Sequence, residues 1–170
     1  MESAPDRQTA FLQLIEQHGG ILHRVRSLYA VDPEDGKDLV QEILMQLWGA
    51  LPSFRGEAAF STWMYRVAIN TALLRRRSAR AQPRQSDDPE ALAALAVAPN
   101  QPDPDVRRLY QCIRELPSLN RAIVLLHLEG HSYEEIARTI GISRGNVSVR
   151  LVRLKARLRD CLMCQPPAKR

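Results

Sequence analysis

Apolar residues recur at three- and four-residue intervals along separate stretches of the chain, a spacing typical of amphipathic helices. The first stretch covers residues 11–28 and is weakened in its middle by Gly19 and Gly20, so it fits one or two helices. A second stretch covers 37–51, and a third runs from a cap at Ser61 or Thr62 to about residue 80. Helices alone therefore account for the N-terminal half.

Residues 82–105 interrupt this pattern, because the stretch is polar, acidic and rich in proline, with only an Ala/Leu patch at 90–97 that suits a helical turn. Helical spacing returns at 106–116 and 119–129. The sequence predicts an all-α protein with two small helical domains, 1–81 and 106–164, joined by a flexible linker over 82–105. The tail beyond Asp160 is expected to fray, with 165–170 outside the second domain.

Residues 132–158 have the signature of a helix-turn-helix. Ser132 and Glu135 have the spacing of a capping box, in which each side chain bonds the backbone N–H of the other residue. Gly141 suits a turn that needs positive φ, and Ser143 can cap a second helix. The turn between the two helices is short, as this motif requires.

The second helix has a buried seam and an outward face. At about 100° per residue the seam consists of Val147, Leu151, Leu154 and Leu158. The opposite arc carries small residues flanked by polar and basic ones, which suits a DNA major groove. A solvated basic face on a small bundle is the alternative. The candidate DNA contacts are Arg144, Asn146, Ser148, Val149, Val152, Arg153 and Lys155.

The charge distribution favours a polyanionic partner for the C-terminal half. The formal net charge is +5, with basic and acidic counts of ten and nine over 1–81, one and five over 82–105, and thirteen and five over 106–170. The balances are therefore +1, −4 and +8. A strongly basic second domain fits binding to DNA through counterion release.

Several other classes of protein are disfavoured. Cys112, Cys161 and Cys164 make an odd total, which argues against a disulfide framework, and no second ligand pair completes a zinc site. The cysteines are interpreted as structural or incidental. No nucleophile–base pair or phosphate-binding Gly loop is present, so no catalytic residue, metal or cofactor is expected. Without a signal sequence or an apolar run of membrane length, a cytoplasmic protein is expected.

Two surfaces of the first domain are candidates for binding. The helix over 37–51 has a polar face that a solvated surface explains by default and partner docking explains as a minority option. The aromatic residues Phe54, Phe60, Trp63 and Tyr65 gather beside Arg55 and Arg66, and such rings and guanidinium groups suit stacking of unpaired bases. The alternative is that Phe60 and Trp63 belong to a core. Arg75, Arg76, Arg77 and Arg80 end the same helix and favour either dipole compensation or phosphate binding.

The stretches DLVQEILMQLW, FRGEAAFSTWMYRVAINTAL and LPSLNRAIVLLHLEGHSYEEIARTIGIS occur in this order. They resemble bacterial RNA polymerase sigma factors of the extracytoplasmic-function (ECF) group, and the resemblance covers nearly the whole chain. It implies a sigma region two over 1–81 and a region four over 106–164. The implied protein binds core polymerase, directs it to promoters, opens the DNA and has no enzymatic activity of its own.

The resemblance assigns a partner to each surface. It implies that Asp38, Gln41, Glu42 and Met45 dock on core polymerase, chiefly on the clamp helices of β′, with further contact to the β subunit. It implies that the minus-ten promoter element is melted and held by Phe54, Arg55, Gly56, Phe60, Trp63, Arg66 and Asn70, of which Asn70 is best placed to bond a flipped base. The family contacts to the minus-thirty-five element fall on Ser148, Val149, Val152 and Arg153.

The resemblance also implies an anti-sigma protein, possibly membrane-bound, as a partner of an otherwise monomeric chain. One alternative is a two-domain regulator with a helix-turn-helix whose first half never touches polymerase. Another is a DNA-processing enzyme such as a recombinase, which is disfavoured because no catalytic Ser, Tyr or acidic triad is evident.

Overall fold

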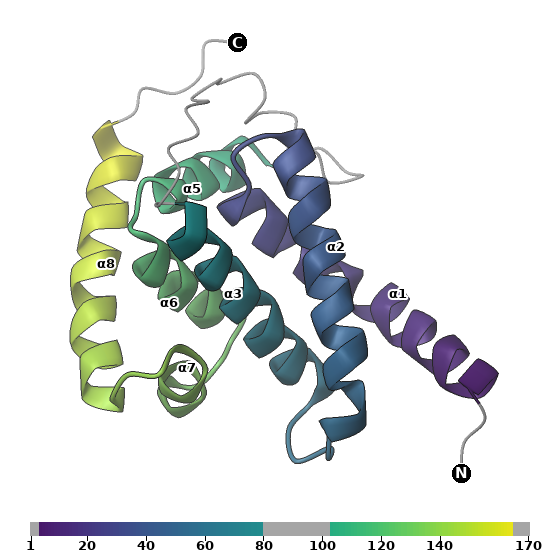
Figure 1. Cartoon of the computed structure of the whole chain (residues 1–170). Helices are drawn as coiled ribbons and strands as arrows, with labels where there is room; N and C mark the ends of the chain where they lie inside the picture. Colours follow the sequence, from purple (N-terminus) through teal and green to yellow (C-terminus); the bar gives the residue numbers. More distant parts are fainter. Residues whose placement is uncertain (1–3, 80–102, 165–170) are drawn as a thin grey trace.

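The computed structural model describes residues 4–79 and 103–164, and these residues form helices with no strand (Figure 1). The expected all-α class is confirmed. The elements are, in order, α1 (Ala4–Tyr29), α2 (Pro33–Ala50), the 3-10 turn η1 (Leu51–Ser53), α3 (Phe60–Ala79), α5 (Pro104–Arg114), α6 (Ser118–Leu128), α7 (Tyr133–Ile140) and α8 (Arg144–Cys164).

Helices α1, α2 and α3 form the first group. α1 continues through Gly19 and Gly20 as one helix, so the weak helix propensity of this pair does not interrupt it. α2 begins at Pro33, and the side chain of Asp32 accepts a hydrogen bond from the backbone N–H of Asp35 at 2.8 Å. The face that α2 buries against α1 and α3 consists of Gly36, Leu39, Ile43 and Leu47.

The start of α3 differs from the expectation. The helix begins at Phe60, and the first carbonyl to accept a helical bond is that of Ala59, from the N–H of Trp63 at 3.1 Å. The expected caps Ser61 and Thr62 therefore lie inside the first turn, because the preceding loop turns at Gly56, which has φ +70°.

The helix-turn-helix is present as predicted. Ser132 Oγ accepts from the N–H of Glu135 at 3.2 Å, and a Glu135 carboxylate oxygen accepts from the N–H of Ser132 at 2.8 Å. Gly141 ends α7 with φ +79°, and Ser143 Oγ accepts from the N–H of Asn146 at 3.2 Å. The predicted fraying just after Asp160 is wrong, because α8 continues for another turn.

The two helical groups pack against each other, whereas the sequence suggested two domains on a tether. α1 lies beside α5, and α3 lies beside α6 and α7, so the buried apolar side chains form one cluster (Figure 1). α5 begins at Pro104, just inside the expected linker. The rest of that linker, its predicted helical turn at 90–97 and the tail at 165–170 lie outside the described residues.

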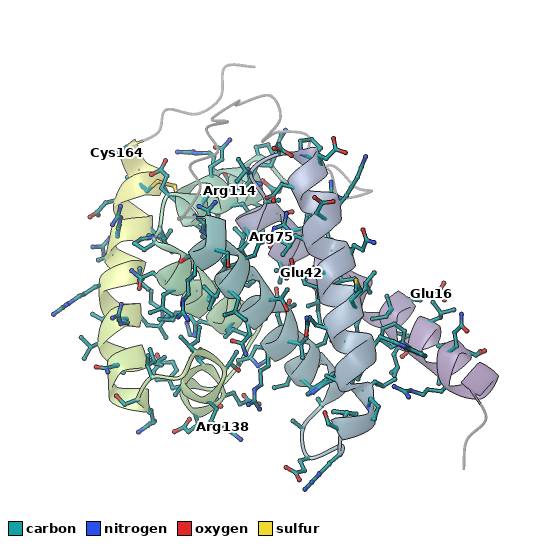
Figure 2. The ribbon with its side chains drawn as sticks, viewed as in Figure 1. Glu16, Glu42, Arg75, Arg114, Arg138 and Cys164 are labelled. Carbon is teal, nitrogen blue, oxygen red and sulfur yellow. A yellow bond between two sulfur atoms is a disulfide. The ribbon has the colours of Figure 1, made fainter. Side chains whose placement is uncertain are left out.

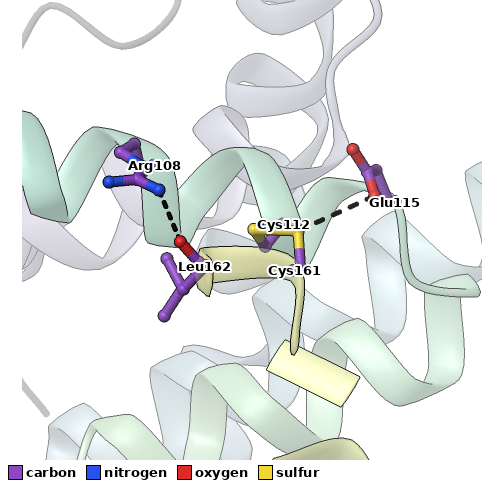
Figure 3. Close-up of a disulfide and its surroundings, with 5 residues drawn as sticks. All are labelled: Arg108, Cys112, Glu115, Cys161 and Leu162. Atoms are coloured by element: carbon purple, nitrogen blue, oxygen red, sulfur yellow. Dashed lines mark hydrogen bonds between the residues drawn. A yellow bond between two sulfur atoms is a disulfide. The ribbon is translucent and has the colours of Figure 1, made fainter. Parts of the chain in front are cut away.

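A disulfide joins Cys112 of α5 to Cys161 of α8, with the two Cα atoms 6.0 Å apart (Figure 3). The argument against disulfides was wrong here. An odd number of cysteines excludes complete pairing but not a single bond, and the packing of α5 on α8 brings these two residues together. Beside the bond, Arg108 donates to the carbonyl of Leu162 at 2.5 Å. Cys164 is an exposed free thiol.

Candidate nucleic-acid interfaces

The outward face of α8 is apolar at its centre. Val149 and Val152 are 52% and 69% exposed, while Val147 and Leu151 on the opposite side are almost fully buried. Their methyl groups are small enough for close approach of another surface and leave apolar area at the centre of a basic helix face. One side of α8 therefore packs on the rest of the protein, and the opposite side is free to contact a flat or grooved partner.

Polar side chains surround this centre. Arg144, Asn146, Arg153 and Lys155 are exposed, and Ser148 is half-buried. Arg144 is anchored by Glu134 of α7, with 2.5 Å between Nε and the carboxylate oxygen. The helix itself is anchored by Arg150, which donates to the side-chain oxygen of Asn120 on α6 at 3.0 Å. Six of the seven predicted positions on this helix are therefore exposed, and the seventh, Ser148, is half-buried.

The aromatic residues of the first group form a compact cluster of rings. The centroid separations are 5.1 Å between Phe54 and Trp63, 5.6 Å between Phe54 and Phe60, and 5.3 Å between Phe60 and Trp63. All three side chains are half-buried. His18 of α1 adds a fourth ring at 5.4 Å from Phe60. The sequence did not identify His18, since it lies about forty residues earlier in a different helix.

The remaining predicted positions extend this cluster along α3. Trp63, Arg66 and Asn70 follow one another at three- and four-residue spacing, which places them on one face of the helix. Arg66 is exposed and Asn70 half-buried, while Arg55 and Gly56 lie exposed in the preceding loop. Tyr65, by contrast, is buried and stacks edge-on against His131 of the second group at 5.3 Å.

The acidic face of α2 is organised by an arginine from α3. Arg75 lies 2.7 Å from a carboxylate oxygen of Asp35 and 3.8 Å from one of Asp38. It also lies 3.2 Å from a carboxylate oxygen of Glu42, which is labelled beside it in Figure 2. Burial alone would lower the pKa of Arg75, but the hydrogen bonds to Asp35 and Glu42 raise it above its usual value. Arg75 was expected either to compensate the helix dipole or to bind phosphate. In the structure it pairs with carboxylates of α2 instead.

The other expected positions on α2 are open to solvent. Gln41 is exposed, Met45 is 68% exposed, and the side chain of Glu42 is 43% exposed despite its ion pair. An apolar thioether beside partly neutralised carboxylates gives this face both apolar and anionic character.

Within the part of the chain that the structure describes, no group of three His, Cys, Asp or Glu residues is arranged to hold a metal ion. None of the helices in this part is long and apolar enough to cross a membrane.

Comparison with known proteins finds two family matches in the chain. Residues 14–82 match the family described as Sigma-70 region 2, and residues 106–158 match Sigma-70, region 4. The first match covers α1 from residue 14 onward together with α2 and α3, and the second covers most of α5 to α8.

Two curated relatives are similar over most of their length. The ECF RNA polymerase sigma factor SigM of Mycobacterium tuberculosis is 33% identical over 150 residues, which cover 88% of this chain and 75% of that protein. The ECF RNA polymerase sigma-E factor of Escherichia coli is 35% identical over 163 residues, covering 87% of this chain and 84% of the relative.

Two solved structures have a similar fold over most of the chain. The sigma factor RpoE in complex with the anti-sigma factor NepR from Bartonella quintana has a TM-score of 0.69 at 21% identity and covers 92% of this chain and 99% of that chain. CnrH in complex with the cytosolic domain of CnrY has a TM-score of 0.63 at 26% identity and covers 94% and 91%, respectively.

Proposed function

The chain belongs to the ECF RNA polymerase sigma factors, and on that basis we propose how its surfaces divide the work of transcription initiation. Helices α1 to α3 act as region two, which binds core polymerase and opens the minus-ten element. Helices α5 to α8 act as region four, which reads the minus-thirty-five element. The bond-making chemistry belongs to the polymerase, so this protein is a positioning factor.

Region four reads duplex DNA through α8. The observation that carries this role is the exposure of Val149 and Val152 at the centre of a basic helix face. Small apolar side chains allow close approach to the major groove and can contact thymine methyl groups. Arg144, Arg153 and Lys155 supply phosphate or base contacts, and Asn146 and Ser148 can bond base edges.

Region two holds an unpaired base beside Phe54, Phe60 and Trp63, with Asn70 bonding its edge and Arg55 and Arg66 near the phosphates. Gly56 gives the loop before α3 its turn. Extruding a base requires a few kcal/mol, and stacking on an aromatic ring returns about 1–3 kcal/mol. The ring separations of 5.1–5.6 Å leave no room for a base between them, so one ring must move or the base must stack on the outer side of the cluster.

The face of α2 formed by Asp38, Gln41, Glu42 and Met45 docks on the clamp helices of β′, and region four makes further contact with the β subunit. Carboxylates beside an exposed methionine suit a partner helix that carries both basic and apolar side chains. Away from polymerase the protein is a cytoplasmic monomer held by an anti-sigma protein. This agrees with the NepR and CnrY complexes of the two structural neighbours.

Reversing the charges of Asp38 and Glu42 to arginine tests the central claim. We expect core polymerase binding to be lost, as measured by co-purification and run-off transcription, while binding of α8 to duplex DNA is retained. Glu16→Arg on the exposed side of α1 is the control, because it changes charge away from this face (Figure 2). Retained core binding in the double variant would reject this docking surface. Absence of core binding by the natural chain would instead favour the two-domain regulator.

A further inference from the structure

The disulfide between α5 and α8 differs from what is usual for the class of protein proposed above. Disulfides persist mainly in secreted proteins, whereas most of those found in the cytosol are transient and take part in catalysis or redox sensing. Cys112 and Cys161 are joined, although the chain is proposed to act on polymerase in the cytoplasm. We therefore expect the bond to open and close in the working protein.

A third cysteine lies one helical turn from this bond. Cys164 is a free, exposed thiol at the end of α8, and it follows Cys161 by three positions (Figure 2). Residues at this spacing share a helix face, with Cα atoms about 5 Å apart, which is a separation that disulfides bridge. The last turn of a helix often tightens to a 3-10 form, in which side chains three positions apart lie directly above one another. Only this turn has to adjust for Cys164 to reach Cys161.

The two bonded cysteines differ in their access to a reacting thiol. Cys112 is only 2% exposed, whereas Cys161 is half-buried. A thiolate that attacks a disulfide forms a bond to one sulfur and releases the other sulfur as a thiolate. Cys161 is the sulfur that can be reached, so Cys112 is the one that is released.

We propose that Cys112, Cys161 and Cys164 form a thiol–disulfide exchange centre. The thiolate of Cys164 attacks Sγ of Cys161, the Cys161–Cys164 bond forms, and Cys112 leaves as a thiolate that takes up a proton. One S–S bond forms as another breaks, so this step needs no external oxidant or reductant. A dithiol in solution can then attack the Cys161–Cys164 bond at the helix end. The dithiol is oxidised to a disulfide, and both cysteines are left as thiols.

Two neighbouring side chains suit both states of the centre. A carboxylate oxygen of Glu115 lies 4.0 Å from Sγ of Cys161 (Figure 3). The bonded sulfur has no proton to donate, but a reduced Cys161 has this acceptor already in place. Arg108 of α5 donates to the carbonyl of Leu162 in α8, and this contact does not depend on sulfur. It holds the two helices together while the bond is open, so the bond can form again.

Opening the bond releases only the C-terminal end of the helix that is proposed to read DNA. The middle of α8 stays fixed by its buried seam and by the hydrogen bond from Arg150 to Asn120. Lys155 lies six residues, or about 9 Å along the helix axis, before Cys161, whereas Val149 lies about 18 Å away. We expect phosphate binding by Lys155 to weaken and contacts of Val149 to persist. This consequence rests on the proposed function, whereas the exchange itself does not.

The position of the free thiol in the full chain tests the exchange. Protein without reductant is held at about pH 8.5, where cysteine in solution is half ionised, and is then labelled with N-ethylmaleimide under acidic unfolding conditions that stop exchange. Trypsin cleavage after Arg108, Arg114 and Arg159 places Cys112 on a different peptide from the other two cysteines. Mass spectrometry should find the label on Cys112 in part of the natural protein and on no cysteine of Cys164→Ser.

A matched variant separates the position of the thiol from its presence. Met163→Cys combined with Cys164→Ser places a thiol at a position that is 80% exposed but only two residues from Cys161, where side chains do not face each other. It should leave Cys112 unlabelled. Helix content and unfolding midpoint show that each variant is folded. Unlabelled Cys112 in the natural protein, equal labelling of Cys112 in the matched variant, or label on Cys112 only in disulfide-linked dimers would overturn the centre.

Reduction kinetics test the role of Cys164 as the route to the bond. Dithiothreitol should open the Cys112 bond several-fold faster in the natural protein than in Cys164→Ser or in the matched variant. Labelling of Cys112 at intervals after addition measures this rate. Equal rates in the three proteins would show that the reductant attacks the bond directly, and the relay through Cys164 would be wrong.

DNA binding by the holoenzyme tests the consequence for promoter reading. Cys112→Ala leaves Cys161 and Cys164 to pair and mimics the released form, whereas Cys164→Ser keeps the bond between α5 and α8. With core polymerase, the released form should bind an upstream duplex several-fold more weakly, and its salt dependence should fall by about one phosphate contact. Equal affinities and salt dependence would overturn this consequence. If neither variant directed polymerase to a promoter, the proposed function would fail, while label on Cys112 of the natural protein would still establish the exchange.

Discussion

The two candidate DNA-binding surfaces are built in opposite ways. On α8, Val149 and Val152 project into solvent from a helix fixed by a buried seam and by Arg150, so the surface exists before any partner arrives. In the first group, Phe54, Phe60 and Trp63 pack on one another and half bury themselves. The outward face of α8 is therefore exposed, whereas the aromatic rings of the first group mainly contact one another.

This difference suits the two forms of DNA that the surfaces are proposed to meet. Duplex DNA offers its groove edges without rearrangement, so a rigid helix loses little entropy on binding it. An unpaired base must first be extruded from the duplex, which costs energy. Aromatic rings that give up contacts with one another and stack on the base can offset part of this energy. Variants of the second group should therefore reveal its rigidity, and variants of the first group its ability to rearrange.

The largest effect is expected from removing the disulfide that joins α5 to α8. Cys112→Ala opens a disulfide that spans 49 residues and should lower the free energy of unfolding of oxidised protein by about 2–4 kcal/mol. Urea unfolding followed by circular dichroism measures this. Cys164→Ala, which removes the exposed free thiol, should have almost no effect. An equal loss under reducing conditions would assign the effect to packing of Cys112 and not to the bond.

Removing a ring should weaken only the adaptable surface. Trp63→Ala should reduce the stability of the opened minus-ten region by about 1–3 kcal/mol, since one stacking platform is lost. Permanganate reactivity of thymines in the promoter measures opening, and footprinting upstream measures α8 binding, which should persist. Trp63→Phe should recover most of the opening.

The matching variant on α8, Val152→Glu, should weaken upstream binding. It should leave the free energy of unfolding unchanged, because this side chain is 69% exposed. If either Trp63→Ala or Val152→Glu reduced promoter opening and upstream binding to a similar extent, the two surfaces would not have separate roles.

Local signals in the sequence predicted much of this arrangement. The capping box at Ser132, the turn at Gly141 and the seam that includes Val147 were all correct, because each depends on residues within one or two helical turns. Of the four aromatic residues expected to gather, Phe54, Phe60 and Trp63 do so, whereas Tyr65 is buried and contacts His131. The predicted roles of these surfaces remain proposals, although the family assignment is confirmed.

Long-range partners could not be predicted in the same way. The bond from Cys112 to Cys161, the capping of α1 by Arg121 and the ion pairs of Arg75 each join residues more than thirty positions apart. Nothing in an isolated arginine indicates whether it meets phosphate, a carboxylate or a helix end. Arg121 was counted as part of a basic segment, yet it is almost fully buried. Charge totals describe the field around a protein and not the partners of its individual side chains.

A smaller effect is expected where α3 meets the acidic face of α2. Arg75→Gln should lower the free energy of unfolding by about 1 kcal/mol, since its ion pairs with Asp35 and Glu42 are part-exposed and screened. It should also change the salt dependence of core binding, because two carboxylates lose their internal counterion. Arg77→Gln removes the same charge from an exposed position two residues further along α3. Equal effects of both variants would show that net charge matters and the position of Arg75 does not.

The smallest effect concerns the cap that starts the helix-turn-helix. Hydrogen bonds from the backbone and then the side chain of Ser132 lower the pKa of Glu135, so the folded state favours its ionised form. This stabilisation is fully present above the unfolded pKa, near 4.5, and disappears as pH falls through the lower folded value. Glu135→Gln should therefore lower the free energy of unfolding by about 0.5–1 kcal/mol at pH 7 and by progressively less below about pH 4.5. Unfolding curves across pH for natural protein, Glu135→Gln and the exposed control Glu16→Gln measure this difference. A deficit that does not shrink in acid would mean that Glu135 acts through packing, and the rigidity of this turn would then not depend on its charge.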